Sequence, residues 1–205
     1  MPHSPKIAVL AVQGDFEQHI VRLRALGAEA FGARLAAEID AADGVVLPGG
    51  ESTTIGKLLA RYGLDDAVRR AHAAGKPIYG TCAGMILLAR DIEAATAEQG
   101  GQNILGLMDV TVARNAYGRQ IDSFESALEG GLPDAAPGEA PLEAVFIRAP
   151  AITRLGAGVE TLASHQGRPV LVRQGSLLAS SFHPELTSDT RIHAFFLRLA
   201  EQARA

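Results

Sequence analysis

The chain has 205 residues, of which 47% are hydrophobic and 20% are charged, and its formal net charge is −4. This length fits a single domain over residues 1–205, which can bury a core without disulfides or a structural metal. An acidic chain without a basic cluster argues against a nucleic-acid partner. No apolar run reaches the roughly 18 residues of a membrane span, and a single cysteine does not require an oxidising compartment. We therefore expect a cytoplasmic protein that binds neither nucleic acid nor membrane.

The first 90 residues contain repeated strand–loop–helix units. Apolar runs typical of strands buried on both faces occupy residues 6–12, 44–47 and 77–79. Helical spacing follows at residues 16–26, 55–59, 68–71 and 86–89. A weak strand at 28–33 and a polar turn with Glu38 and Asp40 come in between, and Asp15 is placed to cap the first helix. Such units predict a parallel sheet with helices on both faces.

The pattern changes after about residue 95. Two loops are expected, a polar one at 95–101 and one rich in glycine, proline and alanine at 130–141. A strand pattern lies at 110–114, and the segments 123–125 and 144–147 could pair with it. A run of antiparallel strands is expected at 159–163, 169–173 and 177–182. A last helix begins at about Ser188. The sequence therefore predicts an α/β fold, a three-layer sandwich with a mostly parallel central sheet and an additional antiparallel strand region.

The only cysteine, Cys82, stands in a Gly-x-Cys-x-Gly turn between a buried strand and a helix. The small residues Gly80 and Gly84 let the backbone bend and pack closely at such a turn. A cysteine nucleophile acts as the thiolate, which the positive end of the following helix favours. Cys82 is therefore a candidate nucleophile that requires a base.

One of the six histidines, His183, is the best candidate for that base. It ends an apolar strand and precedes Pro184 and Glu185, so that a carboxylate could orient its ring. The tripeptide alone is better explained by a turn with a solvated glutamate, but its combination with the cysteine turn favours a nucleophile–base–acid triad. The remaining histidines are expected at the terminus, in helices or in a turn: His3, His19, His72, His193 and His165.

Three loops are expected on one rim, because the carboxyl ends of parallel strands meet at one edge of a sheet. They are Gln13–Gly14, residues 48–52 and Gly80–Cys82. The backbone amides of Gly50 and Ala83 could face an oxyanion there. Alternatively, Gly49 and Gly50, which follow the strand at 44–47, could form a simple turn.

Charged residues near these loops also have two interpretations. Glu51 and Ser52 could cap the following helix and do no more. Arg114 and Arg148 could be solvated edge charges, or they could receive a substrate carboxylate. The sequence has no Walker loop, no Gly-x-Gly-x-x-Gly and no metal-ligand spacing. We expect no metal and no cofactor.

Together these motifs resemble class I, triad-type glutamine amidotransferases. More closely, the chain is similar to the family of glutaminase subunits of pyridoxal 5′-phosphate synthase. The similar segments span nearly the whole chain in the family's order: 10–14, 47–54, 80–84, 114–120, 122–125, 145–150 and 181–187. Gly-Gly-Glu-Ser-Thr-Thr, Arg-Asn-x-x-Gly-Arg-Gln and Phe-Ile-Arg-Ala-Pro are the particular ones. The resemblance implies a class I glutamine amidotransferase-like (flavodoxin-like) fold.

The resemblance further implies hydrolysis of L-glutamine to glutamate and ammonia. Cys82 would attack the side-chain amide, His183 would transfer protons, and Glu185 would hold His183. The amides of Gly50 and Ala83 would bind the oxyanion. The glutamine-binding residues would be Gly50, Glu51, Ser52, Arg114, Ile147 and Arg148.

A partner is implied as well, the (β/α)8-barrel synthase subunit of pyridoxal 5′-phosphate synthase, in a large hetero-oligomer. This subunit would combine the ammonia with a pentose phosphate and a triose phosphate. It would also complete the oxyanion hole of the glutaminase, and Gln13 and Gly14 would lie near the contact. The residues before Lys6 and the loop at 133–141 are longer than the family needs, which could alter docking.

Three alternatives stay open. A glutaminase serving imidazole glycerol phosphate synthesis is opposed by the Arg-Asn-x-x-Gly-Arg-Gln segment. A cysteine sensor on the same sheet would not need the His183–Glu185 pair. A catalytically inactive interaction subunit is disfavoured because all three triad residues are present.

Overall fold

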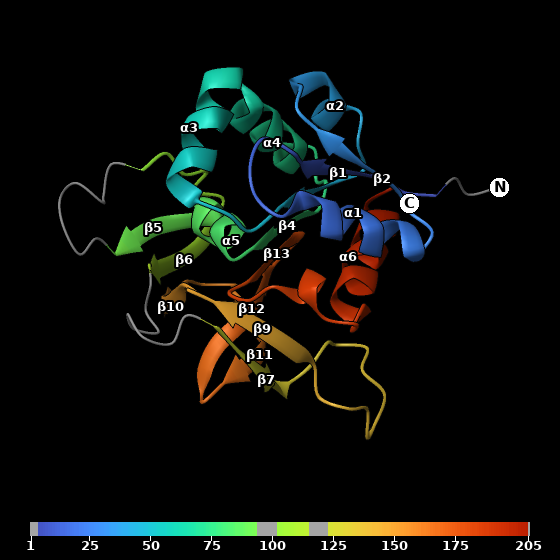
Figure 1. Cartoon of the computed structure of the whole chain (residues 1–205), viewed down its shortest axis with the longest axis vertical. Coiled ribbons are helices and arrows are strands. Elements are labelled where there is room, and N and C mark those ends of the chain that lie inside the picture. Colours follow the sequence, from blue (N-terminus) through green and yellow to red (C-terminus); the bar gives the residue numbers. More distant parts are fainter. Residues whose placement is uncertain (1–3, 94–101, 115–122, 205) are drawn as a thin grey trace.

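The computed structural model describes residues 4–93, 102–114 and 123–204, and an eight-stranded sheet forms its centre (Figure 1). Five neighbouring strands run parallel in the order β2 (Glu29–Ala33), β1 (Lys6–Leu10), β3 (Gly44–Leu47), β4 (Ile78–Thr81) and β13 (Leu177–Ser180). The antiparallel strands β12 (Arg168–Gln174), β11 (Glu160–His165) and β8 (Glu129–Gly130) continue the sheet. The predicted parallel sheet with an antiparallel region is confirmed.

Helices cover both faces of this sheet and complete three layers. One face carries α2 (Ala36–Asp40), α3 (Ser52–Tyr62), α4 (Leu64–Ala73) and α5 (Ala83–Leu88); the other carries α1 (Phe16–Ala25) and α6 (Arg191–Ala203). Alternate residues of β1 serve the two cores: Ala8 and Leu10 pack toward α2–α5, and Ile7 and Val9 toward α1 and α6. No helix in the described part of the chain is long and apolar enough to span a bilayer.

Two small sheets flank the main one. They are β10-β6-β5, made of Ala151–Leu155, Met108–Ala113 and Ala89–Glu93, and β7-β9, made of Ser123–Ala127 and Glu143–Ile147. Residues 123–125 pair with 144–147, and the expected pairing of both segments with 110–114 is wrong. That strand, β6, instead pairs with β10 and β5. The pattern of residues 89–93 gave no strand signal because only Ala89 of β5 is buried.

Local details also correct the sequence analysis. The predicted polar turn at 36–40 is the short helix α2, whose Glu38 carboxylate accepts hydrogen bonds from the backbone amides of Arg34 and Leu35 at 2.7 and 2.9 Å. The side chain of Asp15 makes no cap bond to α1; its backbone N–H donates instead to the Gly49 carbonyl at 3.2 Å. The last helix begins at Arg191 rather than near Ser188, and the Arg191 guanidinium donates a hydrogen bond to the Asp189 carboxylate. The predicted loop at 95–101 lies outside the described residues.

Close backbone packing holds the turn that carries Cys82. A Cβ atom on Gly84 would lie 2.0 Å from the Leu47 carbonyl oxygen of β3, and one on Gly80 would lie 2.5 Å from the Gly84 carbonyl oxygen. Real Cβ atoms essentially never approach that closely, so only glycine lets α5 rest on β3. This contact fixes the start of α5, and with it Cys82, against the sheet.

We expect Gly84→Ala to lower the free energy of unfolding by about 3 kcal/mol, because the added methyl group must displace backbone rather than a side chain. Chemical denaturation measures this change. The matched control is Gly131→Ala, where the added Cβ would meet only Ala135 at 3.8 Å. Equal stabilities of the two variants would contradict the packing account.

Candidate active site

A pocket of about 400 Å³ opens at the carboxyl ends of β1, β3 and β4. Its lining comes from loops that are far apart in sequence: Gln13, Asp15, Gly49, Gly50, Glu51, Ser52, Cys82, Ala83, Ile86, Arg114, Ile147, Arg148, His183 and Leu186. The shared rim predicted from strand topology is therefore present. Of the residues proposed from the sequence, only Gly14 and Glu185 do not line the pocket.

Cys82 sits on a sharp turn at the end of β4. Its φ of 49° lies in the left-handed region, which a non-glycine residue adopts at some energetic cost and often at functional sites. The backbone N–H of Cys82 donates to the Ser180 carbonyl at 2.8 Å, which ties the turn to β13. The sulfur lies 3.9 Å from the Ile147 carbonyl oxygen and is nearly buried. The thiol is thus held at the pocket floor.

His183 reaches the same pocket from the end of β13. Its backbone N–H donates to the Val145 carbonyl at 2.8 Å, and its ring lies so close to Gly49 that a Cβ there would approach Cε1 to 2.4 Å. Its Nδ1 lies 2.7 Å from Oε1 of Glu185, which is completely buried. The structure thus brings thiol, imidazole and carboxylate together in that order.

The charge state of His183 follows from these neighbours. Burial opposes the imidazolium, but the hydrogen bonds with Cys82 and Glu185 and the negative charges of both outweigh burial and raise the pKa of His183 to about 10. The arrangement therefore favours a protonated imidazole beside the sulfur. A protonated imidazole can give its proton to a leaving group.

The glycine loop after β3 is bonded to the Gln13–Gly14 loop. Glu51 N–H donates to Gln13 Oε1 at 2.8 Å, and a Cβ on Gly14 would lie 1.9 Å from the Gly49 carbonyl oxygen. Gly50, which lies in this loop, has a φ of 150°. Within the described residues, the N–H groups of Gly50 and Ala83 have no hydrogen-bond acceptor. As far as the described part of the chain is concerned, both amides can therefore serve a ligand in the pocket.

Opposite charges lie at the mouth of the pocket. Glu51 caps α3, as its sequence position allowed: burial opposes ionisation, but hydrogen bonds from Thr54 and Thr53 outweigh it and lower the pKa of Glu51 to about 2. Arg114 lies 3.7 Å from the Glu51 carboxylate. Arg148 lines the pocket with a φ of 44°. The pocket can thus receive a zwitterion, with cations for a carboxylate and an anion for an ammonium group.

Sequence reasoning missed Gln102. Its Oε1 accepts hydrogen bonds from Arg114 at 3.1 Å and from Ser52 at 3.2 Å, so that it fixes two pocket residues from different elements. No motif marked it, because its partners are 12 and 50 residues away. Asp15, Gly49 and Leu186 also line the pocket and flank predicted residues, and Ile86 lines it from α5. Most of the Arg-Asn-x-x-Gly-Arg-Gln segment lies outside the described residues.

Comparison with known proteins gives a consistent result. The model of the SNO glutamine amidotransferase family matches residues 9–202. The chain is 53% identical over 194 residues to the pyridoxal 5′-phosphate synthase subunit PdxT of Herpetosiphon aurantiacus, covering 94% of this chain and 99% of that protein. It is 52% identical over 196 residues to the PdxT subunit of Parafrankia sp., covering 96% and 93%.

Solved structures support the fold. A crystal structure of a glutamine amidotransferase superposes with a TM-score of 0.85 at 48% identity, covering 95% of this chain and 98% of that one. PurLQS from Thermotoga maritima superposes with a TM-score of 0.63 at 16% identity over 98% of this chain and 97% of that one, which shows the fold alone. The match over residues 9–202, with relatives half identical over almost their whole length, shows that this chain belongs to the SNO glutamine amidotransferase family.

Proposed function

We propose that this chain is the glutaminase subunit of pyridoxal 5′-phosphate synthase, a single domain that hydrolyses L-glutamine to glutamate and ammonia. The observation that carries the proposal is the Cys82–His183–Glu185 constellation beside a pocket with both signs of charge. The PdxT relatives supply the biosynthetic setting. The reaction requires no cofactor, because thiol, imidazole and water provide all its proton and acyl transfers.

Acylation begins at the sulfur. Cys82 Sγ attacks the δ-carbonyl carbon of glutamine, and the negative charge that develops on the oxygen faces the Gly50 and Ala83 amides. His183 donates its proton to the amide nitrogen, the C–N bond breaks and ammonia leaves. Water then gives a proton to His183 and attacks the thioester carbon. The C–S bond breaks, glutamate leaves, and the sulfur of Cys82 is restored.

The same pocket orients glutamine. Arg114 and Arg148 would bind the α-carboxylate, and Glu51 the α-ammonium group, because all three line the pocket. Ser52 and the Ile147 carbonyl would offer further polar contacts, because both residues line the pocket and the Ile147 carbonyl oxygen lies 3.9 Å from the sulfur. The two charged groups of the substrate would then lie at the mouth while its side-chain amide reaches Cys82.

The partner in this proposal is the (β/α)8-barrel synthase subunit, which would receive the ammonia in a large hetero-oligomer. Gln13 and Gly14 are candidate docking residues, because their contacts with Glu51 and Gly49 connect the rim to the glycine loop. Docking there could adjust the Gly50 amide. We also propose a cytoplasmic location, since a chain with one cysteine does not depend on disulfides.

Cys82→Ala and His183→Asn should each reduce glutamate release by at least about 1,000-fold, because each removes a group that forms or breaks a covalent bond. Release of glutamate is measured with the synthase subunit present. His72→Asn, on α4 and outside the pocket, is the matched control and should retain the wild-type rate. Both active-site variants should still bind the synthase subunit. Full activity of either variant would refute the proposed roles.

The raised pKa of His183 gives a second prediction. In an NMR titration of the free subunit, its ring should titrate near pH 10 in the wild type and at a lower pH in Glu185→Gln. Because the pKa of His183 in the folded chain exceeds the ordinary histidine value of 6.5, the protonated ring stabilises the folded chain fully below about pH 6.5. This stabilisation is lost as the pH rises through about 10. His72, whose pKa is lowered by burial, is the internal control. A His183 pKa at or below that of a free imidazole would contradict the ion pair with Glu185.

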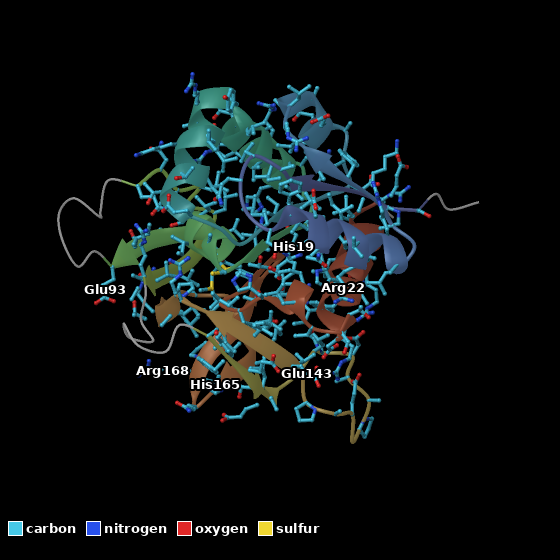
Figure 2. The ribbon with its side chains drawn as sticks, viewed as in Figure 1. His19, Arg22, Glu93, Glu143, His165 and Arg168 are labelled. Carbon is cyan, nitrogen blue, oxygen red and sulfur yellow. The ribbon has the colours of Figure 1, made fainter. Side chains whose placement is uncertain are left out.

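Arg114→Gln should raise the KM for glutamine by roughly tenfold to a hundredfold and change kcat much less, because it removes a charged hydrogen bond to the α-carboxylate. Steady-state kinetics with the synthase subunit measure both constants. Arg168→Gln provides the control, since Arg168 is exposed on β12 and does not line the pocket (Figure 2). An unchanged KM in Arg114→Gln would exclude this binding role.

A further inference from the structure

The buried carboxylate of Glu185 has an oxygen that the triad does not use. Its Oε1 lies 2.7 Å from His183, whereas Oε2 has no hydrogen-bond partner within the usual distance among the described residues. The Nε2 atom of His19 on α1 lies 3.4 Å from Oε2. A completely buried carboxylate is costly without donors on its remaining lone pairs. His19 is therefore the side chain placed to hold it.

His19 is itself fixed by two other buried groups. Its Nδ1 lies 3.0 Å from His193 Nε2 on α6, and its Nε2 lies 3.2 Å from the Thr81 hydroxyl, one residue before Cys82. His19, His193 and Thr81 are all completely buried. Figure 2 shows His19 on α1 together with Arg22, whose Nε lies 3.4 Å from the Glu185 carbonyl oxygen. The helix α1 therefore contacts the Glu185 segment through two side chains.

Both histidines behind the triad are neutral. Burial, followed by His193 and His183, lowers the pKa of His19 well below its ordinary value. Burial, followed by the positive charge of Arg22, lowers the pKa of His193 to about 4, against the opposing effect of Asp189. Each ring consequently carries one proton, and only one proton can lie between the two facing nitrogens.

The position of that proton follows from His193. Its Nδ1 is buried with no partner among the described residues, and an orphaned buried N–H is rarer than an under-satisfied acceptor. The proton of His193 is thus on Nε2, where it is donated to Nδ1 of His19. The proton of His19 is then on Nε2, which faces Thr81 and Glu185.

We propose that His19 is a positioning residue for the triad: its neutral Nε2–H, which lies between the Thr81 hydroxyl and Glu185 Oε2, can close on Oε2 and hold the carboxylate that orients His183. The role rests on the proposed glutaminase function. At 3.4 Å the contact is longer than an ordinary hydrogen bond, and it can tighten when charge develops on His183 during the reaction. His193 acts one step further back by selecting the His19 tautomer.

Two amide substitutions test the direction of the donor. His19→Gln places an N–H group near the Nε2 position, facing Glu185, whereas His19→Asn places it near Nδ1, facing His193. We expect His19→Gln to retain most of the glutamate-release rate. His19→Asn should lower kcat by about tenfold, a small part of the 10²–10⁴ that a positioned acid–base group supplies, with an unchanged KM for glutamine. Equal losses in both variants would show that His19 acts only through packing.

Alkylation of Cys82 by iodoacetamide provides a readout that does not depend on glutamine. Because Cys82 is the only cysteine, its alkylation rate in the free subunit reports thiolate formation without interference. His19→Asn and Glu185→Gln should each slow alkylation, and the double variant should be no slower than Glu185→Gln alone. Additive slowing would overturn the proposal, because it would mean that His19 does not act through Glu185.

Folding and function failures remain distinguishable. Circular dichroism establishes that each variant is folded; if His19→Asn does not fold, His193→Leu, which removes the donor to His19 Nδ1, should slow alkylation without adding to Glu185→Gln. If the wild-type chain releases no glutamate with its synthase but the effects of the two substitutions on alkylation are non-additive, the proposed function is wrong and the His19 inference stands. Wild-type glutamate release with an additive cycle would do the reverse.

Discussion

The 2.7 Å hydrogen bond between His183 Nδ1 and Glu185 Oε1 is the interaction on which the rest of the active site depends. The carboxylate is completely buried, so its charge acts on the imidazole with little competition from water. That charge and the sulfur of Cys82 raise the pKa of His183 against the effect of burial. A proton is thereby kept beside the sulfur, where the proposed reaction would need it for the leaving ammonia.

The fold supplies this arrangement through backbone packing rather than through a large number of polar contacts. Gly84 lets α5 press on β3, which places Cys82 at the end of β4, and the neighbouring strand β13 delivers His183 to the same edge. The two segments are about 100 residues apart in sequence but adjacent in the sheet. The proposed hydrolysis of glutamine for pyridoxal 5′-phosphate synthesis agrees with the family to which the chain belongs.

Strand topology explains why much of the pocket could be predicted from the sequence. Parallel strands bring their carboxyl ends together, so the loops at Gln13, Gly50 and Cys82 had to share a rim. Contacts that depend on side-chain reach gave no such signal. Gln102 bonds residues 12 and 50 positions away, and His19 lies inside a helix whose pattern marks it only as an occupant of one face. The strand β5 escaped prediction because it lacks a buried alternating face.

The most direct test of the central claim is detection of a covalent intermediate. The wild-type chain is mixed with L-glutamine and the synthase subunit, quenched in acid during turnover, and digested for mass spectrometry. We expect a glutamyl group on the peptide that contains Cys82, and no such adduct in Cys82→Ala. Steady glutamate production without any adduct, together with full activity of Cys82→Ala, would contradict nucleophilic attack by Cys82.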